Sequence, residues 1–471
     1  MPERRRDSLT GPPPPPNRRT VLRVALVLVI ALAGARSSAG VLTLPVETRT
    51  LANGLRVLVH PDHSAPVVSS YVFFRVGSRN ENVPRTGMAH LFEHMMFNGG
   101  KRFGPGVFDD MIEGSGGSTN GYTSRDLTAY VNNFPREALD TVLALEADRL
   151  GHLAITAQNL EQERGIVMEE RRLRIDNDVG GTMFERLYLH AFERSPYRWN
   201  TVGFMADLAL ITLEDARRFF ATYYAPNNAV VVLAGDVEAA DAFARVERAF
   251  GRLPRHEPPA PVSAEEPAQD GERRVAVRKR AELPALLVGW KAVRAVDPDR
   301  APLDVLVKLM TGGESARLTR NLMRDHELVT TVGADLQWGI DPELFTLYAQ
   351  ARPGRHVDDI VARVDAVLAR YARETVTPAE LDTARRQLRA DFVKGLKTVS
   401  GKANQLGFFE VVFGDHRAMS GLLEQWDAVT ADDVRRVAAT YLRPAQRTLV
   451  VLDPQPAAPG ATAPADPAGG R

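Results

Sequence analysis

The segment TLEDARRFFATYYAP at residues 212–226 has a second, similar copy in this chain of 471 residues, TADDVRRVAATYLRP at residues 430–444. The Thr, Asp, Arg-Arg, Ala-Thr-Tyr and Pro positions agree at a constant offset of 218. Each copy predicts a helix that begins after a Thr N-cap, stops at Pro and leads into a buried strand, at residues 229–234 and 448–452. The repeat therefore predicts two related α/β domains.

Composition breaks set the limits of the two halves. A polar, Pro-rich stretch predicts a linker at residues 255–272, between domains at residues 43–254 and 273–452. Pro and Ala dominate residues 453–471. Such a composition cannot bury enough apolar surface to offset its ordering entropy, so we expect this tail to be disordered.

The first residues, 1–39, are typical of a signal peptide. A basic region with Arg18 and Arg19 precedes an apolar run at residues 24–35, which ends before the small residues SSA at 37–39. This run is shorter than the roughly 20 residues that span a bilayer. We therefore expect export to the periplasm or the medium rather than a membrane anchor. The choice between the general and the twin-arginine export route stays open.

The pattern of the first half predicts strands and helices in an α+β order. Adjacent strands with helices on one face form a sandwich, so we predict two duplicated α/β sandwich domains, each an antiparallel or mixed sheet covered by helices. The predicted strands span residues 55–60, 67–76 and 120–132, and the predicted helices span residues 87–97, 137–152, 158–174 and 212–224.

Charge and cysteine content exclude several classes of function. Lys plus Arg and Asp plus Glu are both 59, and this balance argues against a nucleic-acid partner, which needs a surplus of basic residues on one face. The chain has no Cys. Disulfides, thiolate zinc sites, iron–sulfur clusters and cysteine nucleophiles are therefore excluded, and a metal here must be bound by His and carboxylates.

The motif H-x-x-E-H at residues 90–94 is the strongest chemical signal. His90 and His94 are spaced i and i+4, about 40° apart around a helix, so both imidazoles can reach one metal ion. Glu93 lies about 60° to the other side of His90, where it can take a proton from a metal-bound water. Solvated histidines on a helix are the alternative, but the apolar residues around them make the opposite face a core face.

Zinc needs a third protein ligand, and the helix at residues 158–174 offers candidates. Glu163 and Glu170 are seven residues apart and share a face, so either could point at the site. The helix also carries Glu161 and Glu169, and for an arbitrary one of these four carboxylates a solvated surface position paired with Arg164, Arg171 or Arg172 is the simpler interpretation. Helix geometry alone does not choose between Glu163 and Glu170.

These residues resemble the pitrilysin/insulinase family of inverted-motif zinc peptidases, in particular the branch with mitochondrial processing peptidase and its bacterial relatives. The resemblance spans nearly the whole mature chain and includes residues 90–94, ERGIVMEE at 163–170, SPYRWNTVG at 195–203 and YAPNN at 224–228. It implies that Glu170 is the distal ligand and that Glu163 supports the site. It also implies a clam-like arrangement of the two domains, with no metal in the second.

The resemblance further implies a zinc endopeptidase with one Zn²⁺ per chain. His90, His94 and Glu170 would bind the ion, and Glu93 would be the general base and later pass the proton to the leaving amine. The peptide substrate would add as an extended strand beside the metal, along the segment that contains Asn120 and Gly121.

One segment departs from the family pattern. Active single-chain members place an Arg and a Tyr from the second half over the scissile bond; Arg324 lies near the expected Arg, but Thr330 and Thr331 stand at the Tyr position. We favour a two-chain enzyme in which a homologous zinc-less subunit, or a second copy in a homodimer, supplies the Arg/Tyr pair. The second possibility is that a different donor substitutes for the pair, or that the activity is weak. A non-catalytic core or scaffold protein of the same family is the alternative function.

Overall fold

The computed structural model describes residues 44–455, all within one compact unit. The predicted signal peptide, residues 1–39, and residues 456–471 of the predicted tail lie outside the described residues. Among the residues that the structure describes, no helix is both long and apolar enough to cross a membrane.

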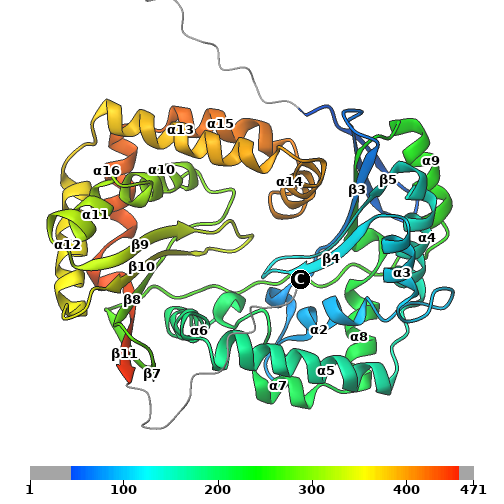
Figure 1. The fold of residues 1–471 in the computed structure, drawn as a ribbon, viewed down its shortest axis with the longest axis horizontal. Coiled ribbons are helices and arrows are strands. Elements are labelled where there is room, and N and C mark those ends of the chain that lie inside the picture. Colours follow the sequence, from blue (N-terminus) through cyan, green and yellow to red (C-terminus); the bar gives the residue numbers. More distant parts are fainter. Residues whose placement is uncertain (1–43, 456–471) are drawn as a thin grey trace, which may run out of the picture. The chain divides into compact units, whose positions relative to one another are not determined.

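The first half of the chain forms a mixed sheet of six strands (Figure 1). The spatial order is β1-β2-β6-β3-β5-β4, in which β2 and β6 are parallel and every other pair is antiparallel. This order leaves β4 at one end of the sheet. The strands are β1 (Glu47–Thr50), β2 (Arg56–Pro61), β3 (Val67–Phe74), β4 (Ser118–Thr123), β5 (Thr128–Pro135) and β6 (Ala229–Gly235).

The second half forms a five-stranded sheet with the order β7-β11-β8-β10-β9. Here β7 and β11 are parallel and the other pairs antiparallel. The strands are β7 (Arg273–Arg280), β8 (Ala285–Lys291), β9 (Val329–Leu336), β10 (Leu344–Ala351) and β11 (Arg447–Gln455).

Helices accompany both sheets in the same sequence order. In the first half they are α2 (Met88–Met95), α3 (Val107–Gly114), α4 (Leu139–His152), α5 (Ala157–Arg171), α6 (Val179–Ala191), α7 (Met205–Leu210), α8 (Leu213–Tyr223) and α9 (Ala239–Phe250). In the second half they are α10 (Arg300–Thr311), α11 (Arg317–Thr319), α12 (Val357–Arg373), α13 (Pro378–Gly395), α14 (Val399–Val412), α15 (Ala418–Ala428) and α16 (Ala431–Tyr441).

The duplicated segments adopt the same local structure. Thr212 and Asp215 form a capping box at the start of α8, and Thr430 and Asp433 form the same box at the start of α16. Each of these helices leads through a Pro-containing turn into a strand at the same place in its sheet, β6 and β11. The predicted α+β fold, with two duplicated sheets covered by helices, is confirmed.

Two predicted element boundaries are wrong. Residues 120–132, predicted as one strand, form parts of β4 and β5, because Ser124 N donates to Leu127 O (2.8 Å) and closes a turn between them. The tail begins later than predicted, since β11 continues to Gln455 and pairs in parallel with β7. Residues 453–455 therefore belong to the second sheet.

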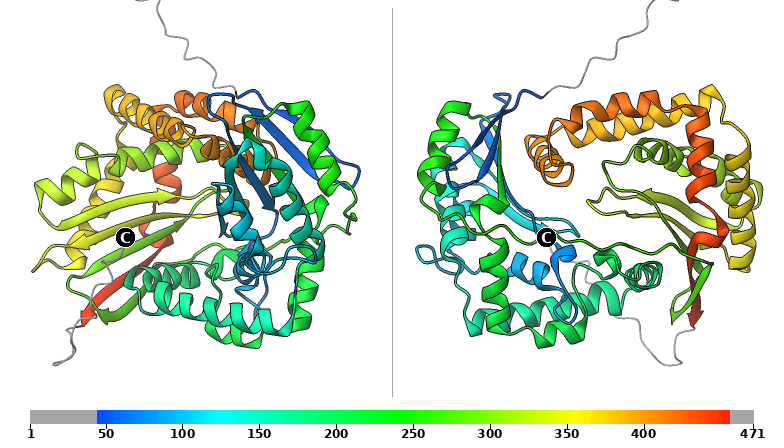
Figure 2. Two further views of the ribbon diagram at one scale, coloured as in Figure 1. Left: turned by 45° about the vertical axis from the view of Figure 1, so that its right-hand side comes forward. Right: turned by 180° about the vertical axis from the view of Figure 1, so that it is seen from behind.

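The two halves exchange one helix each. Helix α6 of the first half packs on β7, β8 and β11, and α14 of the second half packs on β3 and β6 (Figures 1 and 2). Leu187 and Tyr188 on α6 share a buried cluster with Leu287 of the second sheet. On α14, a Cβ at Gly407 would lie 1.9 Å from the Phe73 ring, so only glycine allows this close approach. Each sheet thus obtains part of its cover from the other half.

Residues 255–272 contain neither helix nor strand, but they are fastened to both halves. The Glu266 carboxylate accepts hydrogen bonds from the backbone N–H groups of residues 193–195 and from Lys291 Nζ. Gln269 Nε2 donates to Arg447 O (2.7 Å). The domain limits 43–254 and 273–452 stay predictions, because α6 and α14 each pack on the sheet of the other half.

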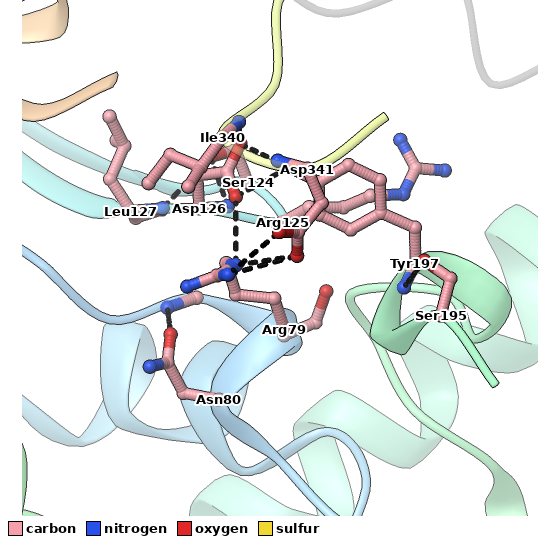
Figure 3. A network of polar contacts seen from close by, with 12 residues as sticks. Arg79, Asn80, Ser124, Arg125, Asp126, Leu127, Ser195, Tyr197, Ile340 and Asp341 are labelled. Atoms are coloured by element: carbon pink, nitrogen blue, oxygen red, sulfur yellow. Dashed lines mark hydrogen bonds and ion pairs between the residues drawn. The ribbon is translucent and has the colours of Figure 1, made fainter. Parts of the chain in front are cut away.

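A buried polar network joins the β4–β5 turn to the second half (Figure 3). Tyr197 Oη donates to both oxygens of Asp126 (2.7 Å each) and accepts from Asp341 N (3.0 Å). Ile340 N also donates to Asp126 (3.0 Å), and Arg79 pairs with Asp341 (2.9 Å). Burial raises the pKa of Asp126 to about 6, although these donors oppose it. The second half thereby fixes the turn that ends β4.

Candidate metal centre

Helix α2, which contains the H-x-x-E-H motif, is anchored at its first turn. The buried Glu81 carboxylate accepts hydrogen bonds from Gly87 N (2.8 Å) and Ala89 N (2.7 Å). Burial raises the pKa of Glu81 to about 8, against the effect of these two N–H groups. The side chains of Leu91 and Phe92 are fully buried in the core, which turns the opposite side of the helix toward α5.

Three of the predicted residues meet at one point. Glu170 Oε2 on α5 lies 3.2 Å from His94 Nε2 and 3.6 Å from His90 Nε2. One ligand atom from each residue lies within 4.8 Å of those of the other two. Ligand atoms of a tetrahedral zinc ion with bonds of about 2.0–2.1 Å are about 3.3 Å apart, so the two distances to Glu170 match such a site.

The electrostatics of the two imidazoles also suit a divalent cation. Burial lowers the pKa of His90 to about 4, so this ring is neutral at pH 7 and its Nε2 is available as a ligand. Burial opposes the charged form of His94, but the neighbouring carboxylates of Glu163 and Glu170 outweigh burial and raise the pKa of His94. The residues therefore present two imidazoles and one carboxylate, which is the donor set of a catalytic zinc site.

Glu163 lies behind His94 rather than among the three ligand atoms. Its Oε2 is 3.7 Å from His94 Nδ1, and its Oε1 accepts a hydrogen bond from Asn98 Nδ2 (3.0 Å). Interaction with His94 lowers the pKa of Glu163, while burial opposes this. A carboxylate in this position orients the imidazole and keeps Nε2 directed at the metal. Of the two alternatives that helix geometry left open, the structure directs Glu170 at both imidazoles.

Glu93 stands beside the three ligand atoms. Its Oε2 lies 4.0 Å from His90 Nε2, and it is absent from the group of potential ligands. Burial raises the pKa of Glu93, and the Thr123 hydroxyl and the charge of His94 oppose this. A partly buried carboxylate with a raised pKa next to a metal site suits a general base.

Strand β4 brings Gly121 directly against the motif. A Cβ at Gly121 would lie 3.2 Å from Glu93 Cγ, so a larger residue would crowd the carboxylate. Because β4 pairs only with β5 in the described sheet, its outer edge can pair with a peptide. Gly121 N donates to Asn120 Oδ1 (2.8 Å), so a peptide that pairs with this N–H would replace that contact. Asn120 lies next to Gly121 on this strand and is exposed.

The second half does not bring Arg324 to this centre. Arg324 forms an exposed ion pair with Glu314, and within residues 44–455 it makes no ion pair or hydrogen bond with the motif residues or Glu170. Thr330 Oγ1 donates to Gln350 Oε1 (3.1 Å) at the start of β9. The predicted contribution of Arg324 is thus not present in this arrangement.

Two contacts of the centre were not predicted from the sequence. Asn98, four residues after His94, holds Glu163, and Arg174, four residues after Glu170, forms an ion pair with Glu170 Oε1 (2.7 Å). The i, i+4 spacing is a signal that could have indicated both. The same spacing is common on solvated helices, so it did not single them out.

A second group, Glu410, Asp415 and His416, also brings potential ligand atoms within 4.8 Å. Arg56 Nε lies 2.9 Å from Glu410, and Arg417 Nη2 lies 2.7 Å from Asp415. His416 Nδ1 is 2.8 Å from Glu410 Oε2. Guanidinium groups already neutralise both carboxylates, so this group is an ion-pair cluster rather than a cation site.

The second half has an ion pair between the two helices that correspond in sequence order to α2 and α5. Helices α10 and α13 occupy the positions in sequence order that α2 and α5 occupy in the first half, and they pack together in the same way. Lys308 Nζ on α10 lies 2.8 Å from Asp391 Oδ2 on α13. The two corresponding helices of the second half are thus joined by an ammonium–carboxylate pair.

We predict that the affinity for zinc falls as the pH drops through the raised pKa of His94. Zinc binds neutral imidazole, and the pKa of His94 is raised, so below this pKa each pH unit weakens binding about tenfold. Zinc dissociation constants measured by chelator competition between pH 5.5 and 8.5 test this. In Glu163→Gln the partner that raises the pKa is lost, so the decline should begin at lower pH. An affinity that is constant across this range would contradict the prediction.

Comparison with known proteins places both halves in one family. Residues 56–202 match the family described as "Insulinase (Peptidase family M16)", and residues 210–388 match "Peptidase M16 inactive domain". The second match includes helix α10 with Lys308 and ends within α13, before Asp391.

Proteins similar to this chain in sequence include zinc proteases. "Zinc protease PqqE" of Helicobacter pylori is 32% identical over 413 residues, which cover 87% of this chain and 93% of that protein. The "Probable mitochondrial-processing peptidase subunit beta" of Arabidopsis thaliana is 27% identical and covers 84% of this chain and 76% of that protein. The crystal structure of a protease from Helicobacter pylori superposes with a TM-score of 0.83 at 32% identity, covering 87% of this chain and 99% of the other.

Proposed function

Because the chain belongs to the insulinase family of peptidases (M16), we propose that it is a zinc-dependent endopeptidase acting on extended peptides or small unfolded proteins. The observation that carries this proposal is the convergence of His90 Nε2, His94 Nε2 and Glu170 Oε2 next to Glu93. These three residues would hold one zinc ion. Zinc, when bound, polarises a peptide carbonyl and activates a coordinated water.

Glu93 is the proposed general base and acid. Its carboxylate accepts a proton from the attacking water as the water oxygen bonds to the carbonyl carbon. When the C–N bond breaks, Glu93 returns the proton to the departing amine. The raised pKa of Glu93 supports this role, because a group that both accepts and donates a proton near neutral pH works best with a pKa near that pH.

Strand β4 is the proposed peptide-binding edge. A peptide that adds to its free edge forms main-chain hydrogen bonds independent of sequence, which suits unfolded substrates. Gly121 lies against Glu93, so a peptide paired beside it has its carbonyl groups next to the general base. Asn120 is proposed to contribute to this edge through its exposed position.

The source of the Arg/Tyr pair expected from the family has two explanations. A homologous zinc-less subunit, or a second copy of the chain, would supply it from outside; the relative named as a subunit beta supports such an assembly. The other explanation is a donor in this chain, and the position of Arg174 beside Glu170 supports it.

Export to the periplasm or the medium remains a proposal from residues 1–39 alone.

Metal removal tests the proposed function. We expect purified protein to contain about one zinc per chain, to lose cleavage of an unfolded protein after treatment with 1,10-phenanthroline, and to regain it with one equivalent of zinc. Mass spectrometry of the metal and of the cleavage products measures both. A chain that binds zinc without cleaving any unfolded protein would support the scaffold alternative. Cleavage that persists without metal would contradict the proposal.

A further inference from the structure

Arg174 owes its position to an irregular end of the ligand helix. Helix α5 does not stop after Glu170 but widens into a π-turn over residues 172–176, in which Asn177 N donates to Arg172 O (2.7 Å). The first turn of α6 holds this π-turn: a Cβ at Gly181 would lie only 2.0 Å from Arg174 O, and Thr182 Oγ1 donates to Ile175 O (2.6 Å). π-turns of this kind often occur at functional sites.

The guanidinium of Arg174 lies on the solvent-exposed side of Glu170. Arg174 Nη1 is 2.7 Å from Glu170 Oε1, the oxygen that does not face the imidazoles. The side chain is 70% exposed, and within residues 44–455 its guanidinium forms no other ion pair or hydrogen bond. Through Glu170 it adjoins the imidazole pair, because Oε2 of the same carboxylate lies 3.2 Å from His94 Nε2.

The free donors of Arg174 meet a chemical need of the proposed reaction. When water attacks the carbonyl carbon, the π electrons of the C=O bond move to the oxygen, which becomes anionic. Guanidinium has five N–H donors and keeps its charge at all relevant pH values. One part of this fork pairs with Glu170, and the other donors are available to a substrate. Arg324, the cation expected from the second half, is paired with Glu314 instead.

We propose that Arg174 is a further catalytic residue, which donates hydrogen bonds to the carbonyl oxygen of the scissile bond as negative charge develops on it. This inference rests on the proposed peptidase function. It supplies from this chain the cation that a zinc-less subunit or a second copy would otherwise provide. As the tetrahedral centre collapses, the C=O bond reforms, the C–N bond breaks, and the amine takes its proton from Glu93.

The test compares Arg174→Gln with Arg172→Gln. Arg172 lies in the same π-turn, but it pairs with the exposed Glu169, so the control removes the same charge away from the centre. Reduced, carboxymethylated α-lactalbumin serves as the first substrate; one peptide that contains a mapped cleavage site then serves for kinetics. A phosphinic analogue of this peptide mimics the tetrahedral, anionic centre. Zinc content and circular dichroism are measured for every variant.

We expect Arg174→Gln to retain zinc and KM while kcat falls about 10²- to 10³-fold, the effect of removing one oxyanion donor. The dissociation constant of the phosphinic analogue should rise by a similar factor. Binding of the peptide itself, measured in the Glu93→Gln background, should not change. Arg172→Gln should behave as the wild type, and Arg174→Lys should recover part of kcat.

Three results would overturn the proposal. The first is a kcat of Arg174→Gln within threefold of the wild type. The second is a loss of activity that follows a loss of zinc, since Arg174 would then act only by orienting Glu170. The third is a wild-type chain that cleaves only when a zinc-less homologue is added. If Glu93→Gln is inactive while Arg174→Gln is active, Arg174 alone is wrongly assigned; if Glu93→Gln is as active as the wild type, the proposed function fails.

Discussion

Glu93→Gln is expected to lower kcat by about 10²- to 10⁴-fold, the usual contribution of a general acid–base group, and to leave zinc bound. The amide has nearly the shape of the carboxylate but cannot accept the proton of the attacking water. Zinc should remain because Glu93 does not belong to the group of three ligand atoms. Peptide cleavage and metal analysis of the same preparation measure both effects.

The control for this variant is Glu161→Gln. Glu161 lies on α5 with its side chain 74% exposed and paired with Arg164, so the same chemical change there should leave kcat within twofold. If Glu93→Gln kept a tenth or more of the wild-type kcat, Glu93 would not be the general base. If it lost zinc, Glu93 would be a ligand, and the assignment of Glu170 would need revision.

Glu170→Gln should weaken zinc binding more than 100-fold and abolish cleavage at ordinary zinc concentrations. Loss of an outer partner of a metal ligand already weakens binding about 10- to 100-fold, and loss of a charged ligand should exceed this range. An amide also leaves Arg174 without its partner at the mouth of the site. Dissociation constants from chelator competition measure the effect.

Glu169→Gln is the matched control, one residue away on the same helix. Glu169 is 66% exposed and pairs with Arg172, so this variant should bind zinc as tightly as the wild type. Equal zinc affinities of the two variants would show that Glu170 is not a ligand. Recovery of cleavage by Glu170→Gln at high zinc concentration would separate the loss of metal from a loss of fold.

Much of the fold could be predicted because the chain is duplicated, so a pattern found in one half could be checked against its copy in the other half. The repeat at residues 212–226 and 430–444 indicated two capped helices, and both capping boxes are present. The β4–β5 turn was missed because SRDL at residues 124–127 has no Gly, Pro or Asn to mark it. The end of β11 was missed because Pro454 suggested a tail, whereas its missing N–H is tolerated within this strand.

The candidate site was predictable where it depends on one helix and less so where it depends on several. The spacing of His90 and His94 fixes their common face, and the structure directs both rings at one carboxylate. The choice between Glu163 and Glu170 required the family resemblance, because seven residues place both on the same side of a helix. Arg174 was not singled out because its i, i+4 spacing from Glu170 is also common on solvated helices.

The exchanged helices α6 and α14 mean that the halves are not independent folding modules. Either half produced alone would expose an apolar sheet face and carry one helix with nothing to pack on. A protease that nicks residues 255–272 would therefore cut the backbone without releasing two fragments. The proposed metal centre in the first half thus depends on a scaffold that the second half completes, and this structural role does not require metal ligands in the second half.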